Sequence, residues 1–464
     1  MRYGMRKVLS GIICLFILMT LISGCSGGSA ATNSGPKKVV RLAYQGILDK
    51  DTIDPISGIT KKGKQSLKEL LEKKLPNYQI DIITIPSDGW IQKTETTIKS
   101  GECDVAWYTN QVMAADWFTD HSEFMKDDQQ VNLNNINSLF LDQAVHYIKY
   151  RSFDKPQSTN QYYGLPIDMS AYFMAYDKQL FDDWGVQPPS ENTTYEELID
   201  KAKKMTGKNP KTGKDNYGTF LKSYWLEWHS IGFNATHPIK ADGMKLANLN
   251  MDNDVEYIKG SPEVLKYFNY LTEALKYAPA GAATGTGSEK FYTKDNDIAI
   301  NMDVSLTGQY LAYTYANKKD VTDRFKPILM PLSKNGMQGF PEFHKVAVVK
   351  NAKDKQAAWE VVKKLTTDKE VVDFLIVNYS TSGVPALKDA SGMKCMELDI
   401  NKKRHEFQKK SIFITDDYWY WREPMNKVLT KVVAKQVTSE QARIEFYNNT
   451  KTWIEDKKKQ LGSN

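Results

Sequence analysis

Apolar residues along the first quarter of the chain follow two alternating spacings. Residues 39–44 and 78–85 are rich in β-branched and aliphatic side chains, which is typical of strands. Residues 64–75 carry leucines three and four positions apart, and residues 90–100 keep a helical spacing up to a glycine. Residues 104–108 predict another strand. This order of strand, helix, strand, helix and strand predicts a largely parallel sheet covered by helices.

The same mixture continues to the end of the chain, so the predicted fold class is α/β. An extended segment is expected at 164–176, and strands are expected at 297–302 and 345–350. Helices are expected at 194–205 (with Thr194 as N-cap), 262–277, 355–365, 368–377, 424–435 and 440–460. A length of 464 residues suits two or three domains.

The N-terminus has the pattern of an export signal. Arg2, Arg6 and Lys7 precede an apolar stretch at 8–22 that is short for a membrane span. The sequence Ile-Ser-Gly-Cys that ends at Cys25 resembles the lipobox of bacterial lipoproteins. This resemblance implies a signal peptide over 1–24, a lipid on Cys25 that attaches the protein to the membrane, and a location outside the cytoplasm. The alternative is an ordinary secretory signal followed by a chance cysteine.

Residues 25–37 are small and polar, which predicts a flexible tether. The formal charge of +6 falls to half that value without the three basic residues of the leader, so no nucleic-acid partner is expected. Cys103 and Cys395 are expected to stay unpaired rather than form a disulfide.

Metal sites and cofactors are not expected. Asp49, Asp51 and Asp54 could hold a calcium ion, but they lack the glycine and the final glutamate of an EF-hand loop, so a solvated loop is favoured. The histidines are dispersed, which indicates no zinc site. Phosphate-binding and serine-hydrolase motifs are absent from the sequence.

Short passages along the chain together resemble the extracellular solute-binding proteins, the large family that includes maltose-binding protein. The first three are Gly-Glu-Cys-Asp-Val-Ala-Trp at 101–107, Tyr-Gly-Leu-Pro-Ile-Asp at 163–168, and Met-Ala-Tyr-Asp-Lys-Gln-Leu-Phe at 174–181, with Asp177 in a usual asparagine place. Further matches lie at 185–189, 194–198, 355–365, 381–386 and 437–442. Each match is weak alone, but their common order is specific.

The resemblance implies a two-lobe fold of the periplasmic-binding-protein type (type II) with three hinge crossovers. The first lobe would be 38–166 plus 343–387, and the second 167–342 plus 388–464. The sequence departs from the family where Asp303-Val-Ser-Leu replaces a common Asp-Gly-Ser-Trp, and again in the segment 339–344. Both departures concern the ligand and leave the implied fold unchanged.

Candidate ligand residues are aromatic or hydrogen-bonding side chains at expected strand ends, crossovers and loops. They are Gln45, Trp107, Tyr108, Asn110, Asp168, Tyr172, Trp225, Trp228, Asp303, Phe343, Tyr418, Trp419, Trp421 and Arg422. Sugars need flat aromatic platforms and directional hydrogen bonds, which this set would supply. Trp225 and Trp228 could instead form one buried helix face, and Asp168 and Asp303 could only cap turns. Four consecutive aromatic residues at 418–421 cannot all share one helical face.

The resemblance predicts a monomeric receptor, not an enzyme, that binds a carbohydrate and delivers it to the permease of an ABC importer. An oligosaccharide is the expected ligand. A peptide or charged metabolite is the alternative ligand, and sensory signalling is an alternative output. A surface glycosidase with two carboxylates is the rival from another class.

Overall fold

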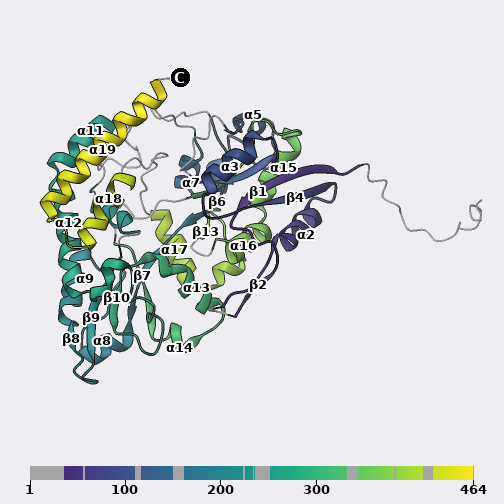
Figure 1. Cartoon of the computed structure of the whole chain (residues 1–464). Helices are drawn as coiled ribbons and strands as arrows, with labels where there is room; N and C mark the ends of the chain where they lie inside the picture. Colours follow the sequence, from purple (N-terminus) through teal and green to yellow (C-terminus); the bar gives the residue numbers. More distant parts are fainter. Residues whose placement is uncertain are drawn as a thin grey trace, which may run out of the picture. The chain divides into compact units, whose positions relative to one another are not determined.

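The computed structural model describes residues 36–55, 58–109, 117–149, 161–222, 225–233, 235, 251–331, 343–380, 383–410 and 422–462. Within these ranges two larger β-sheets and a small two-stranded sheet form, and helices pack on both larger sheets (Figure 1). In the same part of the chain, no helix combines the length and apolar character needed to cross a bilayer.

The first sheet contains six strands among the described residues, in the order β13-β6-β12-β5-β1-β4. Their bounds are β1 (Lys38–Gln45), β4 (Tyr78–Ile85), β5 (Val105–Tyr108), β6 (Leu165–Ser170), β12 (Phe343–Val348) and β13 (Gly383–Pro385). Strand β1 pairs in parallel with β4 and β5, whereas β12 runs antiparallel to β5 and β6. The predicted parallel arrangement is therefore confirmed for β4, β1 and β5 and wrong for the rest of the sheet.

The second sheet contains five described strands in the order β11-β7-β10-β9-β8. Their bounds are β7 (Phe173–Asp177), β8 (Gly207–Lys208), β9 (Asp215–Phe220), β10 (Ile298–Asn301) and β11 (Phe325–Leu329). Only β9 and β10 are parallel. The small sheet pairs β2 (Thr52–Ile53) with β3 (Thr60–Lys61). The extended segment expected at 164–176 is divided, because β6 belongs to the first sheet and β7 to the second.

Helices occupy most of the remaining described chain. They are α2 (Lys64–Lys74), α3 (Trp90–Lys99), α5 (Ser122–Met125), α6 (Ile136–Leu139), α7 (Asp142–Tyr147), α8 (Lys178–Trp184), α9 (Tyr195–Lys204), α10 (His229–Gly232), α11 (Met251–Gly260), α12 (Pro262–Ala274), α13 (Thr307–Tyr315), α14 (Lys319–Thr322), α15 (Lys355–Thr367), α16 (Lys369–Asn378), α17 (Asp399–Lys410), α18 (Arg422–Val433) and α19 (Ser439–Gly462). The predicted N-cap is confirmed: Thr194 and Glu197 form a reciprocal capping box.

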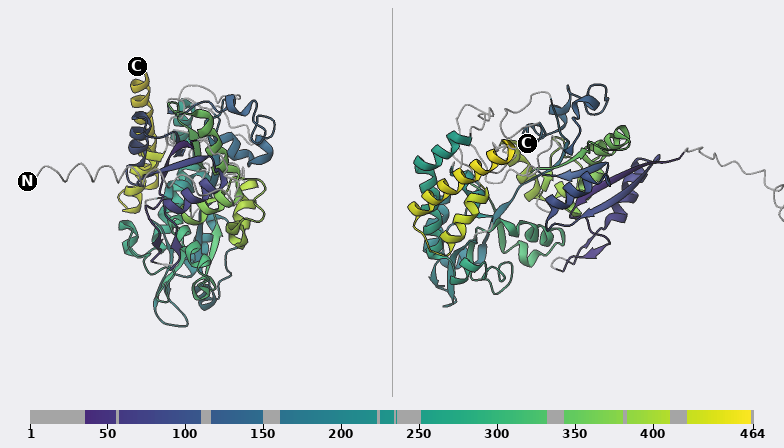
Figure 2. Two further views of the ribbon diagram at one scale, coloured as in Figure 1. Left: turned by 90° about the vertical axis from the view of Figure 1, so that its right-hand side faces the viewer. Right: turned by 45° about the horizontal axis from the view of Figure 1, so that its top comes forward.

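Side-chain alternation gives each sheet two buried faces. In β1, Val40, Leu42 and Tyr44 face a core shared with α2, α15 and α16, whereas Ala43 faces a smaller core with α3. The second sheet packs on α9, α12, α18 and α19 on one face and on α13 on the other. Figures 1 and 2 show α19, in yellow, lying along the teal helix α11, and these two helices are in contact.

The strand limits suggest where the chain passes between lobes. Because β6 continues in the first sheet to Ser170, we propose that the first crossover is the pair Ala171–Tyr172. We likewise propose that the second crossover lies between Leu329, which ends β11, and Phe343, which begins β12. Cys103 and Cys395 are both buried and free, as predicted.

Candidate functional site

One edge of the first sheet gathers several of the predicted ligand residues. Strands β1 and β5 are connected through parallel pairing and end at this edge with Gln45 and Tyr108. Strand β12 begins there because it runs antiparallel to β5, and its His344 pairs with Asp168 near the end of β6. Open α/β sheets bind ligands at the carboxyl ends of their parallel strands. We call this the first edge.

Aromatic rings cluster at the first edge around Trp107. Its indole centroid lies 5.4 Å from Trp90 in an edge-to-face contact, 6.0 Å from Tyr44 and 5.1 Å from the His344 ring. Tyr379 lies 6.3 Å from Tyr44. Trp90 and Tyr379 are partly exposed, whereas Tyr44 and Trp107 are buried beneath them. The edge therefore presents aromatic surface supported by a second aromatic layer.

The polar centre of the first edge is a buried carboxylate. Asp168 Oδ1 lies 2.8 Å from His344 Nδ1, and Ser380 Oγ lies 3.1 Å from the same nitrogen. A catalytic serine triad needs the acid and the serine on opposite ring nitrogens. Because both groups meet Nδ1 here, this trio does not have the geometry of a serine hydrolase.

Gly383 is required beside this carboxylate. A Cβ atom there would lie 2.6 Å from Asp168 Oδ1 and 2.7 Å from Ser380 Oγ, which is closer than real Cβ atoms approach. Among the described residues, Asp168 Oδ2, Ser170 Oγ and the Tyr379 hydroxyl have no hydrogen-bond partner. Unpaired buried polar atoms are costly, so these three groups are candidates for hydrogen bonds to a ligand.

Burial raises the pKa of two tyrosines at the first edge. For Tyr44 the pKa rises well above its ordinary value, mainly through burial and then through the Asp168 charge. For Tyr379 the pKa is raised mainly by burial and then by the charge of Asp51. Both hydroxyls therefore stay protonated at neutral pH and keep their capacity to donate hydrogen bonds.

The second sheet has a corresponding edge, which we call the second edge. Strands β9 and β10 end together, with Phe220 opposite Asn301, and β7 begins at the same end because Ala175 also pairs with Asn301. Lys222 follows β9 and Asp303 follows β10 in the sequence. Lys222 Nζ lies 2.9 Å from Asp303 Oδ2. This contact is an ion pair in which the side chain of Asp303 is fully buried.

Three predicted residues meet at the second edge. The Trp225 and Tyr172 ring centroids lie 5.5 Å apart at an interplanar angle of 31°. The Arg422 guanidinium lies 5.5 Å from the Trp225 ring and 5.2 Å from the Trp228 ring. Its Nε donates to Glu227 Oε1 at 2.9 Å. Tyr172 and Trp225 are partly exposed, so aromatic surface is available at this edge too.

The two edges are joined by a very short piece of chain. Ser170 ends β6 and Phe173 begins β7, so three peptide steps, at most about 11 Å between Cα atoms, separate them. Arg404 on α17 donates to the Ala171 carbonyl at 2.6 Å, and Gln408 donates to the Ser170 carbonyl at 3.1 Å. Burial lowers the pKa of Arg404 to about 10, so it keeps its charge at neutral pH. Helix α17 therefore supports the link between the edges.

The structure separates the predicted ligand residues into three groups. Those at the edges are Gln45, Trp107, Asp168, Tyr172, Trp225, Asp303 and Arg422. Those whose rings fill the cores are Tyr108, Trp228 and Phe343. Those outside the described residues are Asn110, Tyr418, Trp419 and Trp421, as is the lipidation candidate Cys25. Contact with ligand stays a prediction for all of them.

The core placement of the second group has a simple cause. Tyr108 follows Trp107 and points to the opposite face, where it stacks on Phe118 at 4.3 Å and donates to the Tyr163 carbonyl. Phe343 precedes His344, and its ring lies 4.1 Å from Tyr147 in the core cluster that also contains Trp107. Strand alternation thus separates Tyr108 from Trp107, whereas Phe343 lies deeper in the same core.

Sequence reasoning missed Trp90, Tyr379, His344 and Glu227 as parts of these edges. Trp90 carried a signal, because it opens a helix shortly after β4 ends. The others depend on antiparallel pairing and on side-chain contacts between residues far apart in the sequence. The carboxylates at 49, 51 and 54 form ion pairs with Lys64, Lys62 and Lys61. No cluster of possible metal ligands occurs among the described residues.

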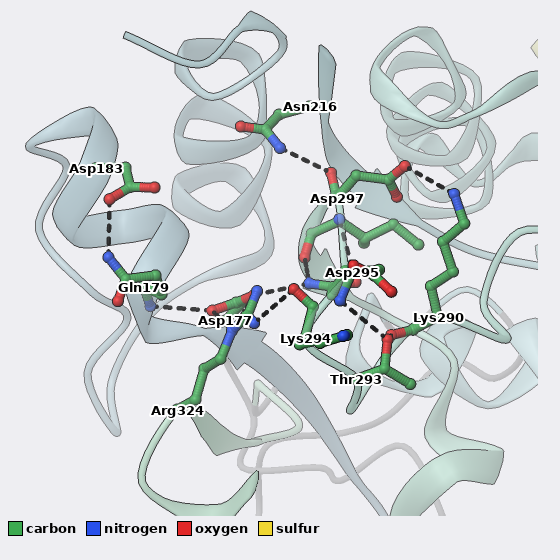
Figure 3. Close-up of polar contacts among 12 residues, drawn as sticks. Asp177, Gln179, Asp183, Asn216, Lys290, Thr293, Lys294, Asp295, Asp297 and Arg324 are labelled. Atoms are coloured by element: carbon green, nitrogen blue, oxygen red, sulfur yellow. Dashed lines mark hydrogen bonds and ion pairs between the residues drawn. The ribbon is translucent and has the colours of Figure 1, made fainter. Parts of the chain in front are cut away.

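Figure 3 shows a polar cluster around Asp177 and Arg324. Because β7 begins at the second edge, its last residue lies at the opposite end of the second sheet. Asp177, the last residue of β7, is fully buried and accepts from Arg324 Nη2 at 2.6 Å and from Asn296 Nδ2 at 2.8 Å. Arg324 also donates to the Lys294 carbonyl at 3.0 Å. The aspartate that replaces the expected asparagine therefore fastens β7 to the starts of β11 and β10.

Two α/β sheets joined directly by the short segment Ala171–Tyr172 are typical of the class of two-lobe solute-binding proteins. Residues 57–372 match the family described as bacterial extracellular solute-binding protein, and the chain belongs to this family. The predicted family and the two-lobe type II fold are therefore confirmed. The family consists of binding proteins rather than enzymes and works outside the cytoplasm.

Solved structures share this fold at low sequence identity. An ABC substrate-binding protein of Listeria monocytogenes in complex with cycloalternan is 17% identical, with a TM-score of 0.63 over 90% of this chain and 98% of that chain. The GacH receptor of Streptomyces glaucescens is 14% identical, with a TM-score of 0.64 over 91% and 100%. Maltose-bound MalE3 of T. maritima is 14% identical, with a TM-score of 0.61 over 89% and 99%. No curated protein gives a significant match to the sequence.

Proposed function

We propose that the protein is a lipid-anchored receptor that binds an oligosaccharide between the two edges and delivers it to an ABC importer. The observation that carries the proposal is the presence of partly exposed aromatic rings at both edges, with Trp90 and Tyr379 at the first and Tyr172 and Trp225 at the second. Stacking on such rings suits the apolar faces of sugar rings.

The pairing of charges supports an uncharged ligand over a charged one. Asp303 is paired with Lys222 and Glu227 with Arg422, and Asp168 is hydrogen-bonded to His344. A charged solute would need an opposite charge, and taking one from these pairs would leave its partner buried and uncompensated. A ligand that offers hydroxyl groups has no such cost. The structurally similar proteins with cycloalternan, acarbose and maltose agree with this choice.

Lobe closure would couple binding to delivery. Residues from both edges contact one ligand only when the lobes approach, so the ligand favours the closed form by its additional contacts there. The link Ala171–Tyr172 is a suitable hinge because it is short and joins the two sheets directly. A permease that recognises only the closed form would then accept only loaded receptor.

Anchoring through Cys25 is supported by the sequence pattern at residues 22–25. Growth of bacteria expressing the full chain with labelled palmitate tests it. Label should appear in the wild-type protein and be absent from the Cys25→Ala variant. Label in both proteins, or in neither, would refute anchoring through this cysteine.

The binding proposal is tested by a thermal-shift screen of the purified protein. Maltose, acarbose, cycloalternan and longer glucans are compared with amino acids, short peptides and polyamines. At a hundredfold excess over Kd, a ligand stabilises the folded protein by about 2.7 kcal/mol. Shifts confined to the saccharides are expected, whereas a shift confined to charged solutes would reject the carbohydrate proposal.

A further inference from the structure

Trp225 has an unusual backbone conformation for its residue type. Its φ of 76° and ψ of −5° lie in the left-handed region, immediately before the short 3-10 turn η1 (Leu226–Trp228). Bulky residues without a special role rarely occupy this region, since Cβ then crowds the neighbouring carbonyl. Such strain persists only where surrounding contacts determine it, and it is concentrated at functional sites.

The residues that follow Trp225 are fixed by contacts in turn. The Leu226 carbonyl accepts from the Tyr267 hydroxyl at 2.8 Å, and the Glu227 carbonyl accepts from Ser230 Oγ at 2.5 Å. The Trp228 ring is fully buried in the second-sheet core. The turn is therefore held by contacts with the core, and Trp225 stands at its start with a partly exposed side chain.

An ion pair from another element completes this support. Glu227 has a fully buried side chain and accepts from Arg422 Nε at 2.9 Å and from Asn426 Nδ2 at 3.4 Å, both on α18. The same guanidinium lies over the rings of Trp225 and Trp228. Arg422 thus joins the turn to α18 through charge and through ring contacts, which a lysine would not reproduce.

We propose that Glu227 and Arg422 are positioning residues whose buried ion pair holds the Trp225 indole at the second edge, where the indole stacks on a sugar ring. The stacking part rests on the proposed function. The positioning part rests only on the contacts above. It changes the role expected for Arg422 from direct contact with the ligand to support of the turn.

The test uses the full chain labelled with 5-fluorotryptophan and observed by fluorine NMR. The chain has ten tryptophans, and the resonance that disappears in Trp225→Phe belongs to residue 225. In wild-type protein this resonance should be single and narrow. In Glu227→Gln and Arg422→Lys it should shift and broaden, while all resonances except that of the neighbouring Trp228 stay in place. Asp177→Asn, which disrupts another buried carboxylate–arginine pair, should leave it unchanged.

The second arm adds maltose, acarbose and cycloalternan to the same samples. A saccharide that binds should shift the Trp225 resonance, and its affinity should fall at least tenfold in Trp225→Ala and Arg422→Lys. If no saccharide binds but the variants move the resonance, the positioning of Trp225 by Glu227 and Arg422 is supported. The carbohydrate function and the stacking of Trp225 on a sugar ring are then rejected. If saccharide binds but the variants leave the resonance and the affinity unchanged, the function stands and the positioning is overturned. A broad Trp225 resonance in the wild type would also overturn the positioning proposal, because it would show that the indole is not held in one place. This outcome does not depend on whether the variants fold.

Discussion

His344 Nδ1 lies 2.8 Å from Asp168 Oδ1, and this contact joins β12 to β6 at the edge where Trp107 also lies. The side chain of Asp168 is fully buried, whereas that of His344 is 14% exposed. The carboxylate therefore orients a ring that remains partly accessible. This is the arrangement by which a buried acid fixes the direction of a histidine at a binding site.

The Asp168→Asn variant should lower both stability and affinity. A hydrogen bond to a charged group contributes about 1 kcal/mol more than a neutral one, so the free energy of unfolding should fall by about 1–2 kcal/mol. Affinity for the bound saccharide should fall about tenfold because the His344 ring is less well held. Urea unfolding and calorimetry measure the two effects. Unchanged values of both would show that the pair does not organise the first edge.

Gly383→Ala tests the packing around the same carboxylate. Its methyl group would lie within 3 Å of Asp168 and Ser380, so the free energy of unfolding should fall by about 1–3 kcal/mol. The matched control is Gly260→Ala, where a Cβ meets no atom within 4 Å at the end of α11. That variant should be neutral or slightly stabilising. Equal behaviour of the two variants in urea unfolding would contradict the close approach at Gly383.

Asp177→Asn separates stability from binding. The variant leaves Arg324 without its buried carboxylate and should lower the free energy of unfolding by about 3 kcal/mol. Saccharide affinity should not change, because this cluster lies at the end of the second sheet opposite the second edge. The control Asp182→Asn removes an exposed ion pair with Lys178 and should have little effect. A loss of affinity in folded Asp177→Asn would place this cluster in the binding machinery.

Two buried histidines predict a pH dependence of stability. Burial lowers the pKa of His121 and of His229 to about 4, from an ordinary value of 6.5. Between about pH 6.5 and pH 4 the unfolded chain binds protons that the folded chain does not, so stability falls as pH falls. Each histidine should contribute a slope of at most about 1.4 kcal/mol per pH unit in this window.

Urea unfolding from pH 7.5 to pH 4 measures this dependence, and His229→Gln is the variant to compare. The slope of unfolding free energy against pH should be steeper in the wild type than in the variant, by at most about 1.4 kcal/mol per pH unit. Parallel curves would show that His229 is not buried in neutral form. His229 is suitable because its Nε2 contacts only one described backbone group, the Met302 carbonyl at 3.1 Å.

Local patterns predicted most elements but not the complete edges. Leucine spacing located α2, and the capping pair Thr194 and Glu197 located α9, because helices are determined by neighbours in sequence. The resemblance implies a lobe boundary at 166–167, within the segment 164–176. Local patterns do not show where this segment divides between the two sheets, since Ala171 and Tyr172 carry no turn signal. The partnership of Asp168 with His344 spans 176 residues and depends on antiparallel register, which periodicity does not report.

The first and second edges were predicted only in part, because the sequence shows strand ends but not contacts between distant residues. Trp107 and Asp303 stand where strands end, so the strand-end rule found them. Arg422 was found for its place beside an aromatic run, but its role beside Glu227 needed the three-dimensional contact. Tyr108 was not distinguished from Trp107 because the sequence does not show which face of the sheet lies beside the other lobe.

The most direct test of a sugar site between the two edges is calorimetric titration of a saccharide from the thermal-shift screen into four proteins. These are the wild type, Trp90→Ala at the first edge, Trp225→Ala at the second, and the control Trp184→Ala, whose indole binds Asn216 at the far end of the second sheet. We predict one saturable site in the wild type, at least a tenfold loss of affinity in each edge variant, and wild-type affinity in the control. Saturable binding that neither edge variant weakens would contradict a ligand site between the edges.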